Sequence, residues 1–144
     1  MKKIIEGRKY DTDTSCEVYR WKSGRVVDFY FIDEALYRKR NGEYFLHGYG
    51  HAETKYAKYN ELAGGWEAGE AIVPLSYDDA ARWMEQHADA DAYEAEFGEI
   101  SEGGGQVAVT VRVREGAKAK LAREAARLGV SQGELVERMI ARLG

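Results

Sequence analysis

The sequence predicts an α+β protein: an antiparallel strand meander followed by helices, joined by a Gly linker to a C-terminal strand-helix-helix that forms an intertwined dimer. Two observations lead to this class. The first half of the chain alternates apolar and polar residues between turn dipeptides, which is typical of half-buried strands. From residue 76 onward the apolar residues recur at helical spacing, except in one valine-rich stretch near the C-terminus.

Three consecutive glycines at 103–105 mark a change of composition. We therefore expect an acidic α+β domain of unknown function at 1–100, a Gly-rich linker at 101–106 and a separate domain at 107–144. Residues 1–105 contain 13 Lys and Arg against 21 Asp and Glu, a net charge of −8, whereas residues 106–144 contain 8 against 4, a net charge of +4. A basic segment on an acidic protein is typical of a region that meets a polyanion.

Turn dipeptides set the expected order of the first strands. Glu6-Gly7 predicts a hairpin within "KKIIEGRKYD", and Ser23-Gly24 ends the strand "TSCEVYRWKSG". In the next stretch, Val27, Phe29 and Phe31 alternate with Asp28 and Tyr30, which predicts a further half-buried strand.

The clearest hairpin turns at Asn41-Gly42, a dipeptide that type I′ turns favour because both residues need positive φ. In that register Arg40 pairs with Glu43 and Tyr37 with Leu46. We expect residues 49–70 to be loop in large part. Residues 71–75 then predict a short edge strand, because Pro74 has no amide to donate to a ladder.

Two helices complete the first domain. The first begins with a capping pair, Ser76 and Asp79. Its apolar face consists of Ala80, Trp83, Met84 and His87. The stretch "DADAYEAEFGEI" predicts a second, shorter helix that buries Tyr93 and Phe97.

The pattern of the C-terminal domain predicts one strand and two helices. In "QVAVTVRVREG" at 106–116, valines alternate with Ala108, Thr110 and Arg112, the pattern of a strand with one buried face. The first helix ends at Gly129 in the usual manner, and Ser131 with the glutamate three residues later opens the second.

So few residues cannot close a core unaided, and a lone strand leaves its backbone groups unpaired. We therefore expect two chains to pair their strands antiparallel and to pack four helices beneath the valine face. The expected dimer core consists of Val109, Val111, Val113, Leu121, Leu128, Leu135, Met139 and Ile140.

Residues 107–143 resemble a ribbon-helix-helix domain of the Arc, CopG and MetJ type. "VTVRV" stands at the strand of that family, and "LAREAARLGVSQGEL" at its helix, tight turn and second helix start. The resemblance implies a homodimer that places its two-stranded ribbon in the major groove of double-stranded DNA.

The resemblance also implies two sets of DNA contacts. The base-contacting residues are the outward strand residues Ala108, Thr110 and Arg112. The phosphate-binding groups are the backbone amides of Ser131, Gln132 and Gly133 at the helix start. The alternative is that the module only dimerises the protein, and that Thr and Arg are ordinary residues on an exposed strand face.

The N-terminal domain resembles an uncharacterised family of bacterial mobile-element proteins. "KKIIEGRKYDTDT", "ALYRKRNGEYFLHGYG" and "EAIVPLS" carry the resemblance, which implies no activity. We expect no enzyme, no catalytic residue, no metal site and no cofactor. His47 and His51 are four residues apart, but the glycines between them argue against a helical zinc site. No apolar run is long enough to cross a membrane, and a single cysteine excludes an internal disulfide, so we expect a cytoplasmic protein.

Two functional hypotheses remain open. The first is a dimeric DNA-binding transcriptional regulator, an autorepressor, with an acidic N-terminal domain that senses a ligand or binds a partner. The second is an antitoxin-like protein or an inhibitor of a defence system, such as an anti-CRISPR protein, whose N-terminal domain binds a protein target. This order, with the partner-binding domain first and the ribbon-helix-helix domain last, resembles that of the HicB-type antitoxins. Tyr49, Tyr56, Tyr59 and Trp66 are candidates either for such a surface or for the core of the domain.

Overall fold

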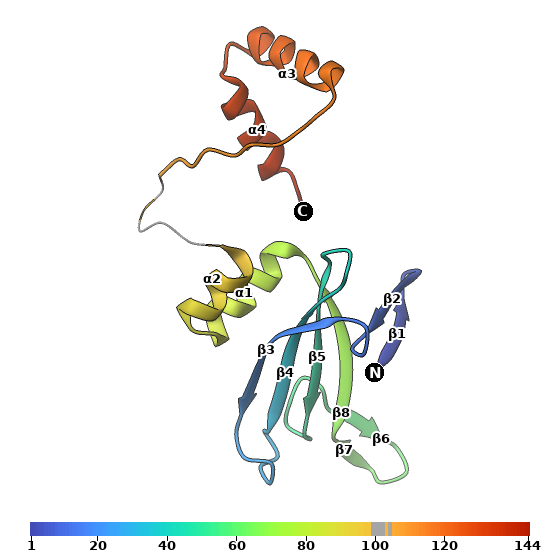
Figure 1. Ribbon diagram of the computed structural model, residues 1–144. Coiled ribbons are helices and arrows are strands. Elements are labelled where there is room, and N and C mark those ends of the chain that lie inside the picture. The colour runs from blue at the N-terminus through green and yellow to red at the C-terminus, as the bar shows by residue number, and fades with distance from the viewer. Residues whose placement is uncertain (99–102, 104) are drawn as a thin grey trace. The chain divides into compact units, whose positions relative to one another are not determined.

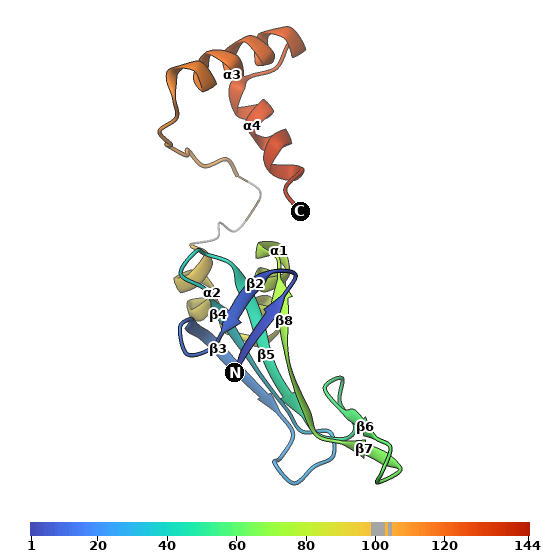
Figure 2. The same cartoon turned by 90° about the vertical axis from the view of Figure 1, so that its right-hand side faces the viewer.

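The computed structural model describes residues 1–98, 103 and 105–144 (Figures 1 and 2). The chain divides into two compact units, Met1–Ile100 and Ser101–Gly144. The described residues form antiparallel sheets and four helices, so the α+β class is confirmed. Residues 101, 102 and 104 of the expected linker lie outside the described residues.

A four-stranded antiparallel sheet in the order β3-β4-β5-β8 forms the centre of the N-terminal unit. Its strands are β3 (Cys16–Ser23), β4 (Ile32–Arg38), β5 (Tyr44–Gly50) and β8 (Gly69–Leu75). Pro74 lies in β8 at the edge of this sheet, as predicted. The predicted first hairpin is also confirmed, since β1 (Lys2–Ile5) pairs with β2 (Arg8–Asp11) through Glu6 and Gly7, both at positive φ.

The two faces of the sheet are covered by different elements (Figure 1). On one face α1 (Tyr77–His87) packs Ala80, Trp83 and Met84 onto Leu36 and Leu46. The core of the opposite face consists of Tyr10, Ala35, Tyr37, Phe45 and Ile72. Strand β4 is therefore buried on both sides, because neighbouring residues of a strand point to opposite faces.

The predicted N-cap and the predicted apolar face of α1 are confirmed. The Ser76 hydroxyl accepts a hydrogen bond from the Asp79 amide at 3.1 Å. The second predicted helix is α2 (Ala90–Phe97), whose Tyr93 and Phe97 are half-buried against the same core as α1. Glu96 fastens α2 to the sheet, because its carboxylate accepts hydrogen bonds from Tyr44 and Arg38, each at 2.6 Å.

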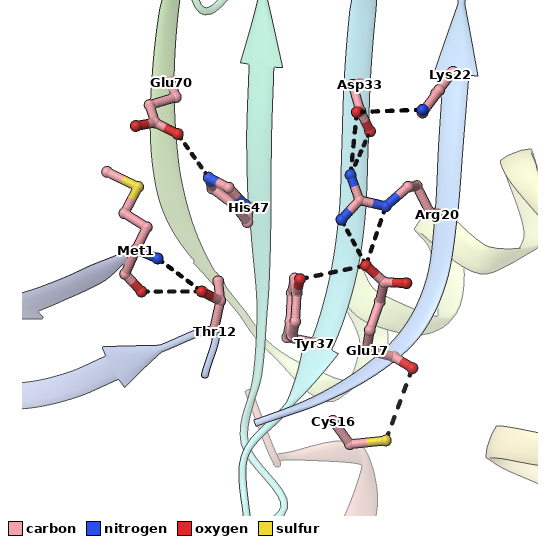
Figure 3. Close-up of polar contacts among 10 residues, drawn as sticks. All are labelled: Met1, Thr12, Cys16, Glu17, Arg20, Lys22, Asp33, Tyr37, His47 and Glu70. Carbon is pink, nitrogen blue, oxygen red and sulfur yellow. Dashed lines mark hydrogen bonds and ion pairs between the residues drawn. The ribbon is translucent and has the colours of Figure 1, made fainter. Parts of the chain in front are cut away.

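Away from the β1–β2 hairpin, the second face of the sheet is polar (Figure 3). Arg20 donates to both carboxylate oxygens of Asp33, at 3.0 and 3.1 Å, and to Glu17 at 2.6 Å. The Tyr37 hydroxyl donates to the same Glu17 at 3.3 Å. These contacts join β3 and β4 across a face on which Arg20 remains exposed.

The predicted strand at residues 25–33 is wrong over residues 25–31, and Ile32 and Asp33 belong to β4. Residues 25–31 form turns, in which the Asp28 carboxylate accepts from the Arg25 amide at 2.7 Å and the Phe31 amide donates to the Asp28 carbonyl at 3.1 Å. The local hydrogen bonds of Asp28 thus prevail over the alternating pattern. The apolar residues of this loop other than Phe31 are exposed, namely Val26, Val27, Phe29 and Tyr30.

The Asn41-Gly42 hairpin exists, but its predicted turn and register are wrong. Gly42 has positive φ and Asn41 does not, so the turn is not of type I′. The Lys39 amide donates to the Glu43 carbonyl at 2.8 Å, which closes a loop of three residues. The register therefore shifts by one: Tyr37 faces Phe45, and Arg38 faces Tyr44.

Residues 51–68 contain a small hairpin, β6 (Lys58–Asn60) with β7 (Gly65–Glu67), which the sequence did not predict. Tyr56, before this hairpin, is buried, whereas Tyr59 and Trp66 on the hairpin are exposed. The aromatic residues predicted for either the core or a binding surface are therefore divided between the two.

The described part of the C-terminal unit contains α3 (Glu115–Leu128) and α4 (Gln132–Ala141). Gly129 ends α3 in the left-handed conformation, with φ of 69°. The predicted helix boundaries at Gly129 and Ser131 are therefore confirmed.

Candidate nucleic-acid interface

The valine-rich stretch pairs with no strand among the residues that the structure describes. Residues 106–114 have no regular secondary structure. The exposed fractions of its valines are 79% for Val107, 77% for Val109, 71% for Val111 and 59% for Val113. Four β-branched side chains in alternation, all exposed, are costly in water unless another surface covers them.

A second set of apolar side chains in the C-terminal unit is also exposed. It consists of Leu128, Met139, Ile140 and Leu143. Among the described residues of this unit only Ala125 and Leu135 are buried, and Leu121 is half-buried. Of the residues expected in the dimer core, the single chain thus brings Leu135 and Leu121 inside and leaves the others to solvent.

The residues expected to contact bases alternate with the exposed valines. Ala108, Thr110 and Arg112 are all exposed. Arg112 makes no ion pair or hydrogen bond with the described residues, so all its guanidinium donors are available to a ligand. A guanidinium on a strand can bind the two acceptors of a guanine edge.

The expected phosphate site has the geometry of a capped helix start. The Ser131 hydroxyl accepts from the Glu134 amide at 3.0 Å, which completes the cap of α4. The amides of Gln132 and Gly133 belong to the first turn, where no intrahelical acceptor exists. They are exposed together with Ser131, so these groups can hold an anion at the positive end of the helix.

The acidic residues of this unit are partly neutralised within their own helices. Glu124 of α3 pairs with Arg127, and this hydrogen bond lowers the pKa of the Glu124 carboxyl. Glu134 of α4 accepts from Arg138 at 3.0 Å. Among the described residues no ion pair is formed by Arg112, Arg114, Lys118, Arg123 or Arg142, and Lys120 acts on Glu124 through its charge. The unpaired positive charge of this unit therefore extends from the valine stretch along α3 and occurs again after α4.

His47 and His51, the two histidines considered as a zinc pair, each make a hydrogen bond of their own. His47 Nε2 contacts Glu70 at 2.9 Å (Figure 3), and His51 Nδ1 contacts the Asp28 carbonyl at 2.8 Å. No group of three metal-ligating side chains occurs within residues 1–98, 103 and 105–144. Within the same residues no helix combines the length and apolar character needed to cross a membrane.

Sequence reasoning missed one buried polar cluster in the N-terminal unit. The Glu34 carboxylate in β4 is bound by Lys55 at 3.1 Å and by the indole N–H of Trp83 at 3.2 Å. The signal was present, because Ile32, Glu34 and Leu36 alternate toward one face of the strand. The strand predicted at 25–33 ended one residue before Glu34 and concealed this alternation.

Comparison of the chain with protein-family models, with curated proteins and with solved structures finds no match.

Proposed function

We propose that the protein is a dimeric DNA-binding transcriptional regulator, an autorepressor, that uses residues 107–144 as a ribbon-helix-helix domain. The observation that carries this proposal is the alternation of exposed valines with Thr110 and Arg112 in a stretch that has no strand partner within the described part of the chain. A second copy supplies the missing ladder, and pairing buries the valine row while the other row stays outside.

The helices support the same arrangement. Each copy exposes Leu128, Met139 and Ile140, and a two-fold dimer covers such a patch with its own equivalent. The anion-binding start of α4 would then occur twice, on either side of the ribbon. The paired Arg112 side chains would read bases, and the two helix starts would fix the protein on the phosphates.

Binding of the purified protein to its own upstream DNA tests the proposal, beside a scrambled duplex of the same length. We expect preference for the upstream DNA and affinity that falls as salt rises, because bound phosphates release counterions. Sedimentation of the free protein should show a dimer. Equal and feeble binding to both duplexes would leave the module as a dimerisation element only.

We infer a second candidate function, antitoxin-like or defence-system inhibition, from the exposed apolar side chains of the N-terminal unit. Phe29 and Tyr30 in the β3–β4 loop, and Tyr59 and Trp66 on the β6–β7 hairpin, are each more than half exposed. Exposed aromatic residues are typical of protein interfaces. A stable, stoichiometric complex with one protein, lost in Trp66→Ala and Phe29→Ala, would support this function.

A further inference from the structure

A pocket of about 360 Å³ opens on the N-terminal unit beside the end of α1. This volume lies in the lower part of the range for small-molecule sites, about 300–1,000 Å³. Its lining residues are Trp21, Tyr30, Ile32, Glu34, Glu53, Thr54, Lys55 and His87. They come from β3, the β3–β4 loop, β4, the loop before β6 and the last turn of α1, so segments distant in sequence meet here.

The base of the pocket carries a buried negative charge. Glu34 is only 2% exposed, the lowest value among the charged residues that the structure describes. A carboxylate is removed from water at high cost unless ionic and hydrogen-bond partners replace its hydration. Trp83 supplies one neutral donor, and the positive charge comes from Lys55 alone among the described residues.

Lys55 reaches Glu34 from the solvent side. Its side chain is 61% exposed, and it lies in the loop between β5 and β6. A long, exposed lysine loses rotamer freedom when it is held in an ion pair, whereas the buried carboxylate requires some cation in this place. An external cation can therefore take the place of this ammonium on the carboxylate.

Aromatic rings form the walls around the carboxylate. The rings of Trp21 and His87 lie 3.9 Å apart, and Tyr30 is 57% exposed at the pocket. Burial lowers the pKa of His87, so this ring is a neutral wall and not a competing cation. A desolvated cation is attracted to the faces of tryptophan and tyrosine rings.

The buried hydroxyl of Tyr56 lies next to the Glu34 carboxylate. Tyr56 is only 6% exposed. Burial and the negative charge of Glu34 raise the pKa of Tyr56, so the hydroxyl stays protonated as a donor next to the carboxylate. The pocket is lined by two carboxylates, those of Glu34 and Glu53, and by one ammonium, that of Lys55.

We propose that this pocket binds a small organic cation, an alkylammonium or alkylguanidinium compound, on the Glu34 carboxylate between the rings of Trp21 and Tyr30. Lys55 acts as the internal counter-ion of the empty site, and the ligand displaces it. The alkyl part of the ligand contacts the indole of Trp21. The site goes beyond the proposed DNA binding and does not depend on it.

Calorimetric titration of the full chain with butylamine and agmatine tests the proposal, with 1-butanol as the uncharged control. Two of the three tryptophans belong to the site, so Trp66→Phe removes the remaining background for a parallel fluorescence titration. We expect saturable binding of both cations at millimolar concentrations or below, and none of the alcohol.

Three variants identify the carboxylate and its competitor. Glu34→Gln keeps the shape and should lose binding. Lys55→Met keeps the alkyl chain and removes the ammonium, so we expect about tenfold tighter binding, because an internal competitor lowers apparent affinity. Lys58→Met, an exposed lysine that does not line the pocket, should bind like the parent.

Circular dichroism first establishes that each variant is folded. The proposal is overturned if the parent shows no saturable binding of either cation, whether or not the variants fold. Binding that is equal in folded Glu34→Gln and in the parent also overturns it, since the cation would then bind elsewhere on the acidic surface.

Discussion

Gly48 lies in β5 directly against the ring of Tyr56. A Cβ atom at this position would lie 1.9 Å from Tyr56 Cζ, so the buried ring would have to move. We expect Gly48→Ala to lower the free energy of unfolding by about 1–3 kcal/mol, the usual cost of overpacking a core. Urea unfolding measures this change. Gly65→Ala is the control, because a Cβ there meets nothing within 4 Å, and equal losses in the two variants would contradict the prediction.

His87 gives the stability of the N-terminal unit a dependence on pH. Burial lowers the pKa of His87 from its ordinary 6.5, so the folded state disfavours a proton that the unfolded chain accepts. The contribution of neutral His87 is therefore complete above the unfolded pKa and is lost as the pH falls through the folded one.

We expect the free energy of unfolding of the parent to decline as the pH falls below about 6.5, the ordinary pKa of histidine. The decline should be smaller in His87→Gln, which has no proton to bind in this window. Urea unfolding at a series of pH values measures both slopes. The same slope in the two proteins would show that another group carries the dependence.

Arg112 is the residue from which we expect most of the base recognition. Arg112→Ala should weaken binding to the upstream DNA by roughly 1–3 kcal/mol and leave the dimer intact, because the side chain lies outside the valine row. Fluorescence anisotropy with labelled duplex measures the change. Arg40→Ala, an exposed arginine of the N-terminal unit, is the matched control. An Arg112→Ala protein with parental affinity and preference would mean that the ribbon does not read bases.

At the scale of one element, the N-cap of α1 has a simple expected energy. Ser76→Ala removes the acceptor of the Asp79 amide and should cost about 1 kcal/mol of stability. Ser76→Asp supplies another acceptor and should recover most of this loss. Thermal and urea unfolding of the three proteins measure the difference. If Ser76→Asp is no better than Ser76→Ala, the hydroxyl does not act as a cap.

The helices could be predicted because their signals are local. Ser76 and Ser131 begin α1 and α4, and Gly129 ends α3, through contacts within a few residues. The apolar face of α1 followed from the same short-range periodicity. Helix positions therefore required no knowledge of the sheet.

The strands were harder to predict, because the local chemistry of a few residues decided between alternatives. Asp28 turned an alternating stretch into a loop. In the β4–β5 hairpin the Asn41 side chain accepts from the Glu43 amide at 3.1 Å, which stabilises a three-residue loop and moves the register by one. Such a shift leaves the composition of the hairpin unchanged, so only the hydrogen bonds reveal it.

The two candidate sites differ in how far the sequence led to them. The resemblance to ribbon-helix-helix domains implies Thr110 and Arg112 as base-contacting residues, and both side chains are exposed in the structure. The Glu34 pocket joins β3, the β3–β4 loop, β4, the β5–β6 loop and α1, and no spacing in the sequence predicts that these segments meet. They are brought together only by the pairing of the sheet strands.

At the scale of the whole molecule, the main question is what covers the C-terminal unit. Val111→Lys tests the intertwined dimer, because pairing would bury an ammonium among valines without a counter-ion. Burial of an unpaired charge costs several kcal/mol, so the variant should sediment as a monomer at concentrations where the parent is a dimer. Since the ribbon requires both strands, this variant should also lose its preference for the upstream DNA.

Thr110→Lys is the matched control, because it places the same lysine one residue earlier, on the opposite side of the strand. The alternation of a strand keeps this ammonium in water, so the variant should remain a dimer. Its added charge near the phosphates should steepen the salt dependence of DNA binding. Dissociation of both variants would indicate that residues 106–114 tolerate no lysine on either side, and dissociation of neither would place the dimer contact outside the valine row. Only the loss of the dimer in Val111→Lys alone agrees with a ribbon that has one buried and one open face.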